Sequence, residues 1–225
     1  MKSFADFLMK YYQGLQPPKN LPNDVVVMNP YQNSETFQIA SAFYHKYYDD
    51  SNERHICFGI NPGRFGAGVT GVPFTDPIRL EEVCGISNDL EKKAELSSRF
   101  IYDMIESFGG PEKFYSKFYI SAVSPLGYVR DGVNLNYYDI KGFREMFKDY
   151  AVKEIKKQFS LGISRKIAFS IGKGQNIKYL NWLNDQYNLF DKILPLSHPR
   201  WVMQYRLKRK AAFVQEYMDA FNSTR

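Results

Sequence analysis

The feature of this sequence that most restricts its fold is a repeated order of short apolar run, glycine- or proline-containing loop and helical segment. Four apolar runs have the length of strands: residues 54–60, 118–123, 167–171 and 192–196. Nearly continuous apolar strands are typical of parallel sheets that are buried on both faces. Alternation with helices predicts a three-layer α/β/α sandwich around a central four-stranded parallel sheet. A ligand site in such a fold lies beyond the carboxyl ends of the strands.

The apolar spacing predicts helices between and around these strands. We expect them over residues 4–15, 35–48, 77–83, 94–108, 140–159, 175–187 and 203–221, and we expect a loop between residues 126 and 139. A chain of 225 residues is long enough for one well-packed α/β core and short for two. We therefore expect a single domain over residues 1–225, with residues 1–50 as a helical extension packed on it.

The composition narrows the classes of partner and cofactor. A net charge of +6 and a pI near 9.1 favour a polyanionic partner. Two cysteines, Cys57 and Cys84, exclude a four-thiolate zinc or iron–sulfur site. The N-terminal segment has no apolar run of the length of a signal peptide or a membrane span. We expect a cytoplasmic monomer that needs neither metal nor cofactor.

The segment FGINPGRFGAGVTGVPF, residues 58–74, changes abruptly from an apolar strand end to a glycine-rich loop. Residues 66–71 match the spacing of the dinucleotide-binding fingerprint, but Pro73 and Pro77 prevent the long helix that this fingerprint must open. The turn at residues 172–174 does not match a Walker A loop, because Ile167 stands in place of its first glycine. Backbone rather than side chains is exposed in the loop at residues 58–74, so we expect a ligand to approach closely there.

This segment resembles the first motif of the uracil-DNA glycosylase superfamily, most closely its single-strand-selective monofunctional branch. The motif of that branch reads G-M-N-P-G-P-F-G followed by T-G-V-P-F-G, and this chain has GINPGRFG and then TGVPF with similar spacing. The second motif of the family begins with His-Pro after the last strand, as His198 and Pro199 do here. With weaker similarities in between, the resemblance spans residues 54–209 and leaves the N-terminal helices outside it.

The resemblance implies a catalytic pair and a base pocket. Removal of a base from deoxyribose passes through an oxocarbenium-like sugar, so the site needs a positioned water and a partner for the charge on the leaving base. Residues at the positions of Asn61 and His198 fill those two roles in the family. Phe74 matches the ring on which the family stacks the flipped base. Gly63, Phe65 and Gly66 would shape the pocket floor. No lysine matches a nucleophile position, which implies a monofunctional hydrolase.

One departure from the family affects the choice of base. The family reads the polar edge of uracil with an asparagine in the pattern H-N-L-C-P-L, and the matching stretch here is SAVSPL. Ala122 replaces that asparagine, and only the hydroxyls of Ser121 and Ser124 stand nearby. Loss of a bidentate reading group lowers discrimination. The substrate is therefore predicted to be a deaminated base in DNA, with xanthine or hypoxanthine as alternatives to uracil.

A basic and aromatic segment follows His198. We expect it to contact DNA phosphates and to fill the space left by a flipped base, with Lys173 as a further phosphate contact. The predicted DNA-binding residues are Lys173, Arg200, Trp201, Tyr205, Arg206, Lys208 and Arg209.

Two other function classes remain open from the sequence. A non-catalytic nucleic-acid-binding module that kept the pocket is conceivable because of Ala122, although retention of Asn61 and His198 argues against it. A nucleotide-binding oxidoreductase built on residues 66–71 is the third reading. Salt-sensitive DNA binding would be shared by the glycosylase and the binding module and absent from the oxidoreductase.

Overall fold

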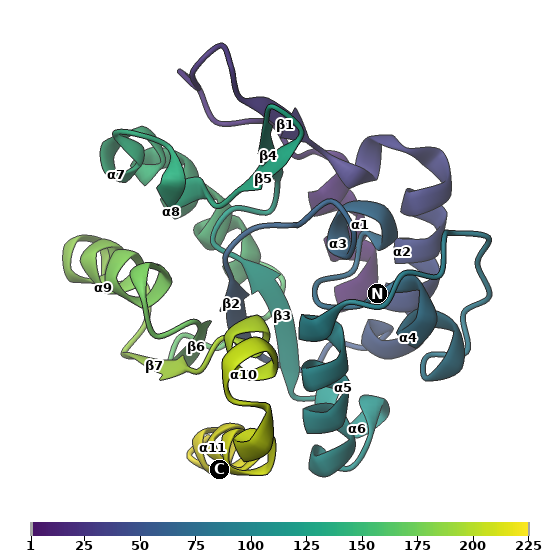
Figure 1. Ribbon diagram of the computed structural model, residues 1–225. Helices are drawn as coiled ribbons and strands as arrows, with labels where there is room; N and C mark the ends of the chain where they lie inside the picture. Colours follow the sequence, from purple (N-terminus) through teal and green to yellow (C-terminus); the bar gives the residue numbers. More distant parts are fainter. Residues whose placement is uncertain (1, 225) are drawn as a thin grey trace.

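The computed structural model describes residues 2–224. Its central sheet is parallel, with the strand order β3-β2-β6-β7 (Figure 1). These strands are β2 (His55–Gly59), β3 (Phe118–Ala122), β6 (Ile167–Ile171) and β7 (Lys192–Leu196). Helices cover both faces of the sheet, so the predicted three-layer sandwich around a four-stranded parallel sheet is confirmed.

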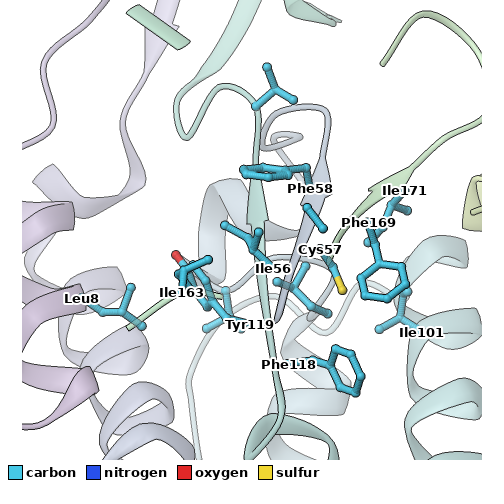
Figure 2. Packing of buried hydrophobic residues seen from close by; sticks show 14 of the residues in the cluster. Leu8, Ile56, Cys57, Phe58, Ile101, Phe118, Tyr119, Ile163, Phe169 and Ile171 are labelled. Atoms are coloured by element: carbon cyan, nitrogen blue, oxygen red, sulfur yellow. The ribbon is translucent and has the colours of Figure 1, made fainter. Parts of the chain in front are cut away.

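Alternation along the strands divides the core between two faces of the sheet. Ile56 and Tyr119 point toward α1 (Phe4–Gln13), whereas Cys57, Phe118 and Phe169 point the other way, toward Ile101 of α5 (Figure 2). Phe118 and Phe169 also meet Phe221, with ring centroids 4.4 and 5.1 Å apart. Residues of one strand with odd and even numbers therefore face different helical layers.

The helices lie close to the positions that the apolar spacing predicts. They are α2 (Ser34–Tyr48), α3 (Ala67–Thr70), α4 (Pro77–Glu82), α5 (Leu96–Phe108), α6 (Pro111–Tyr115), α7 (Phe143–Met146), α8 (Lys148–Phe159), α9 (Gln175–Tyr187), α10 (Pro199–Tyr205) and α11 (Lys210–Asn222), with short 3₁₀ turns η1 (Pro30–Gln32), η2 (Tyr137–Asp139) and η3 (Leu207–Arg209). No helix within residues 2–224 is long and apolar enough to cross a membrane.

Two predicted helices are interrupted. The segment 140–159 does not form one helix, because Gly142 has a left-handed φ of 76° and Phe147 separates α7 from α8. The segment 203–221 is broken between α10 and α11, where Arg206 leaves the helical region with φ −136° and ψ 23°. Neither a proline nor a glycine marks this second break, so the spacing of apolar residues gave no sign of it.

A second, three-stranded antiparallel sheet was not predicted at all. It has the order β1-β4-β5 and consists of β1 (Val26–Met28), β4 (Gly127–Arg130) and β5 (Val133–Leu135). The segment expected to be a loop is therefore a β-hairpin followed by η2. Asp131 and Gly132, with φ of 50° and 72°, form its two-residue turn. Figure 1 shows this hairpin on one side of the parallel sheet's carboxyl edge and α10 on another.

The N-terminal helices contribute to the same buried core as the sheet. Phe4, Leu8 and Tyr12 of α1 are buried, and the Tyr12 hydroxyl is 2.6 Å from that of Tyr119 on β3. From η1, the Tyr31 hydroxyl donates to the Gly71 carbonyl at 2.9 Å. In α2, the Thr36 hydroxyl donates to the Val69 carbonyl at 3.0 Å. The N-terminal part of the chain thus supports the glycine-rich loop through hydrogen bonds to the carbonyls of Val69 and Gly71.

Candidate active site

A pocket of about 700 Å³ lies at the carboxyl end of the parallel sheet. Its lining comes from the ends of β2, β3 and β6, from the β5–η2 segment, from the start of α5 and from α10. Asn61, Phe74 and His198 all contribute to it. The structure therefore brings together residues from the two segments that resemble the family motifs, and it places them where an open α/β fold binds its ligand.

The hairpin fixes the side chain of Asn61. Its Nδ2 donates to the Leu135 carbonyl at 3.0 Å and to the Pro62 carbonyl at 3.3 Å. Its Oδ1 accepts a hydrogen bond from the Tyr137 backbone N–H at 2.9 Å. These contacts define which atom of the amide is oxygen, and they leave Oδ1 with one lone pair for a further donor such as water. Asn61 is thus a rigid acceptor at the edge of the pocket.

His198 is held as a neutral hydrogen-bond donor. It is the N-cap of α10, and its Nδ1 accepts the Arg200 backbone N–H at 3.2 Å. In the neutral ring the proton therefore lies on Nε2. Burial, with a smaller effect of the Arg200 charge, lowers the pKa of His198 to about 4. At neutral pH the ring can donate from Nε2 to a ligand in the pocket without carrying a charge.

Phe74 lies over the end of β2. Its backbone adopts a left-handed φ of 53°, which is uncommon for a bulky residue and is typical of functional sites. The ring needs Gly59 beneath it, since a Cβ at that position would lie 3.1 Å from the Phe74 Cε2. The Phe74 and His198 ring centroids are 6.3 Å apart, edge to face. The ring therefore lies next to the histidine on the pocket wall, as a stacking platform requires.

Strand β3 presents a backbone and a methyl group to the pocket, but no polar side chain. Ala122 lines the pocket and pairs with Gly59 in register. The neighbouring Ser121 also lines the pocket, but its hydroxyl points to the opposite face, where it donates to Gln158 Oε1 at 2.7 Å. The fully buried Ser124 bonds to the Tyr128 hydroxyl at 2.7 Å and does not line the pocket. The hydroxyls of Ser121 and Ser124, the polar groups that the sequence places beside Ala122, thus bond to other side chains.

The predicted pocket floor is only partly assembled. Gly63 lines the pocket, whereas Gly66 is the buried N-cap residue of α3 and does not. Phe65 is 45% exposed and also lies outside the lining. It contacts two cationic side chains, Arg64 and Lys93, rather than the pocket.

The basic segment divides into a pocket wall and an outer surface. Arg200 and Trp201 line the pocket, and the Arg206 guanidinium carbon lies 4.9 Å from the centroid of the Trp201 ring. Tyr205 is 65% exposed on the same helix, and Lys208 and Arg209 follow in the exposed turn η3. Lys173 lines the pocket but forms an ion pair with Glu216 at 3.0 Å, so part of its charge is already compensated.

Sequence reasoning missed several polar residues of the site. Asn134, Asn136, Gln175, Asn176 and Glu95 all line the pocket. Asn176 is buried, and its amide is used by the Phe58 and Gly59 carbonyls and by the Tyr137 hydroxyl. Burial, and then the charge of Asp76, raises the pKa of the Glu95 carboxyl, which Arg200 partly offsets. Within residues 2–224 there is no group of three or more His, Cys, Asp and Glu side chains that could hold a metal ion.

Comparison with known proteins defines the class of this chain. A sequence model described as the Uracil DNA glycosylase superfamily matches residues 45–222. Because this match covers most of the chain, the protein belongs to the uracil-DNA glycosylase superfamily, as the motifs around Asn61 and His198 indicate. A search of curated proteins found no match.

Among solved structures, the chain is similar to the crystal structure of wild-type SMUG2 from Pedobacter heparinus. The two share 42% sequence identity and superpose with a TM-score of 0.96 over 100% of this chain and 99% of that chain. Similarity of this extent includes the N-terminal helices, which lie outside the region where the motifs match. It is consistent with the branch of the superfamily that the first motif resembles.

Proposed function

We propose that this protein is a monofunctional DNA glycosylase that hydrolyses the N-glycosidic bond of a deaminated base flipped out of DNA, in base-excision repair. The observation that carries the proposal is the meeting of Asn61, Phe74 and neutral His198 in one pocket at the carboxyl edge of the sheet. A basic and aromatic surface on α10 adjoins this pocket, which suits a polyanionic substrate.

The geometry supports a division of labour in the reaction. Asn61 Oδ1 orients a water for attack on C1′ of the sugar, and the rigid contacts of its amide keep that acceptor in place. As the bond from C1′ to the base nitrogen breaks, its electron pair moves into the base. The Nε2–H of His198 donates to a carbonyl oxygen of the departing base, where that charge accumulates. Asparagine is too weak a base to take the proton, which passes to solvent.

The base is proposed to be uracil, with xanthine and hypoxanthine as further substrates. All three carry a ring carbonyl next to a ring N–H, which deamination creates. The wall at Ala122 has no carboxamide for the edge of uracil, and the hydroxyl of Ser121 is turned away. A pocket of about 700 Å³ has room for a purine. These features support a wider choice of base than a pocket with a reading asparagine would allow.

The proposal is tested by incubating the protein, in EDTA, with labelled oligonucleotides. Each carries one uracil, xanthine or hypoxanthine and is tested both as a single strand and as a duplex. Treatment with alkali then cleaves any abasic site. Because the enzyme would be monofunctional, we expect strand cleavage only after alkali. Cleavage of a single base type would name the substrate directly.

Two matched pairs of variants connect cleavage to the site. Asn61→Ala and His198→Ala should each lower the single-turnover rate by about 10²- to 10³-fold. Asn52→Ala and His45→Ala change the same residue types at exposed positions outside the pocket and should leave it unchanged. If DNA is bound but every base survives, the protein is a binding module instead. Cleavage that persists in both site variants would reject the assigned roles.

A further inference from the structure

A cluster of two cations and one aromatic ring lies outside the machinery described so far. The Arg64 guanidinium carbon is 4.7 Å from the centroid of the Phe65 ring, and the Lys93 Nζ is 4.3 Å from the same centroid. The two cations come from separate segments, the glycine-rich loop and the loop before α5. All three side chains are exposed. We call this group the Phe65 cluster.

The charges of the Phe65 cluster are uncompensated within the described chain. Neither Arg64 nor Lys93 forms an ion pair with any of residues 2–224, although several other surface cations do. Two like charges near one ring repel each other, and the ring's negative face offsets this only in part. An anion placed between them would remove the repulsion and gain two charge-assisted contacts.

The cluster is anchored to the hairpin at the edge of the pocket. The Arg64 backbone N–H donates to Asn134 Oδ1 at 3.3 Å, and both Gly63 and Asn134 line the pocket. A Cβ added at Gly132 in the hairpin turn would lie 4.0 Å from Arg64 Nη1. Val133, next to that turn, is 61% exposed. The Phe65 cluster and the hairpin turn thus lie next to the pocket edge that Gly63 and Asn134 form, and α10 forms another edge.

Nearby acidic groups restrict where an anion can lie. Glu95 lines the pocket beside Gly66, and Asp131 is exposed at the hairpin turn. A phosphate inside the pocket would meet the Glu95 carboxyl, whereas one on the outer surface of Phe65 would meet the two cations. This arrangement of charges fits a DNA strand whose phosphates stay outside the pocket while an uncharged base enters it.

We propose that Arg64, Lys93 and Phe65 form a phosphate-binding site for the DNA strand that carries the target base. This inference rests on the proposed glycosylase function and adds a second DNA contact, separate from the basic segment on α10. Arg64 and Lys93 hold one backbone phosphate beside the flipped nucleotide, and Phe65 keeps both cations in place. The site positions the strand and takes no part in the chemical step.

The first test measures salt-dependent binding to a single-stranded oligonucleotide with a stable abasic analogue. Arg64→Gln, Lys93→Gln and the double variant are compared with wild type. Lys117→Gln is the matched control, since Lys117 is exposed at the start of β3, at the opposite end of the sheet. The slope of log affinity against log salt concentration should become shallower by about 0.7 in the double variant, which loses its contact with one phosphate. Affinity of the double variant should fall roughly tenfold.

The second test locates the contact on the DNA. Each phosphate near the analogue is replaced in turn by an uncharged methylphosphonate. One replacement should weaken binding by wild type and by Lys117→Gln, but not by the double variant. If every methylphosphonate weakened wild type and the double variant equally, the proposal would be overturned, even if the double variant bound DNA more weakly overall.

The outcomes separate this inference from the proposed function. If wild type binds and cleaves DNA while the double variant keeps the salt slope of the Lys117→Gln control, the phosphate site is rejected and the glycosylase stands. If wild type neither binds nor cleaves any oligonucleotide, the proposed function fails and the phosphate site fails with it.

Discussion

Replacement of Asn61 by alanine separates the structural and chemical roles of this side chain. The amide makes three hydrogen bonds, to the Leu135 and Pro62 carbonyls and from the Tyr137 N–H. Two of these join the glycine-rich loop to the β5–η2 segment. Truncation therefore removes both the acceptor for the water and the clamp that holds it.

The size of the structural effect follows from those contacts. Asn61 is partly exposed, so water can replace much of what is lost, and each hydrogen bond to the β5–η2 segment contributes about 0.5–1.5 kcal/mol. Asn61→Ala should lower the free energy of unfolding by about 1–2 kcal/mol. For a domain of this size that corresponds to a Tm lower by about 2–8 °C. The variant stays folded at 25 °C, so its activity can be measured.

Asn61→Asp makes the test more specific. One carboxylate oxygen can still accept from Tyr137, but the other must face the Leu135 carbonyl oxygen, at the position where Nδ2 now lies 3.0 Å away. Repulsion between these oxygens raises the pKa of the new carboxyl in the folded state above its unfolded value of about 3.9. The folded state then binds the proton more tightly, so the stability lost at neutral pH should return as the pH falls toward that value.

Thermal unfolding and single-turnover cleavage are measured on the same preparations of wild type and both variants. We expect Asn61→Ala to lose about 1–2 kcal/mol and at least 10²-fold in rate. An unchanged Tm would contradict the clamp between Asn61 and the β5–η2 segment. An unchanged rate in the folded protein would remove Asn61 from the chemistry and refute the assignment of water positioning.

Three further predictions concern other parts of the site. Because the pKa of His198 is about 4, the single-turnover rate should stay level from pH 7 to about 5 and fall only near pH 4. A rise in the rate below pH 6.5 would instead indicate that His198 acts as a cationic acid. Its folded pKa lies below the unfolded value of about 6.5, so this residue should lower stability as the pH falls between those two values, an effect absent from His198→Ala. Ala122→Asn should raise kcat/KM for uracil by about 10-fold or more, because the new carboxamide can bond to the edge of that base. The preference is measured by competition between uracil and hypoxanthine oligonucleotides. Equal gains for both bases would contradict a role of this position in base recognition. Tyr31→Phe removes a buried hydrogen bond to the Gly71 carbonyl and should lower the unfolding free energy by about 1–3 kcal/mol. Cleavage should also become slower. An unchanged rate would show that the position of Phe74 does not depend on this hydrogen bond.

The parallel sheet could be predicted because three of its strands, β2, β3 and β6, are almost entirely buried. The four apolar runs have the required length, and their boundaries agree with the structure within two residues. The motif segments could be assigned because their spacing is specific, and both lie at strand ends as expected. The position of Ala122 on the pocket wall followed from the same alignment of patterns.

The sequence of the small sheet contains a hairpin pattern that was interpreted only as a loop. Asp131-Gly132 is a strong two-residue hairpin sequence, and short apolar positions flank it on both sides. The break at Arg206 has no such local signal, because tertiary packing of α10 and α11 against α5 decides it. Ser121 lines the pocket, but its hydroxyl donates to Gln158 on the opposite face of β3, as the alternation of side chains along a strand could have indicated. No local pattern distinguishes an exposed Phe65 from a buried one.

These misses have a common physical origin that also bears on function. The residues proposed for the chemical step, Asn61 and His198, follow strands of the sheet, where apolar periodicity fixes the backbone, and the structure brings them together in one pocket. Residues that hold the acceptor or meet the strand lie on the hairpin and on loops, where polar side chains have no periodicity. The hairpin connects the two groups, because β5 and η2 bind Asn61 while Asn134 binds the backbone of Arg64. A phosphate bound at Arg64 would therefore act on the same hairpin that holds Asn61, the acceptor proposed for the attacking water.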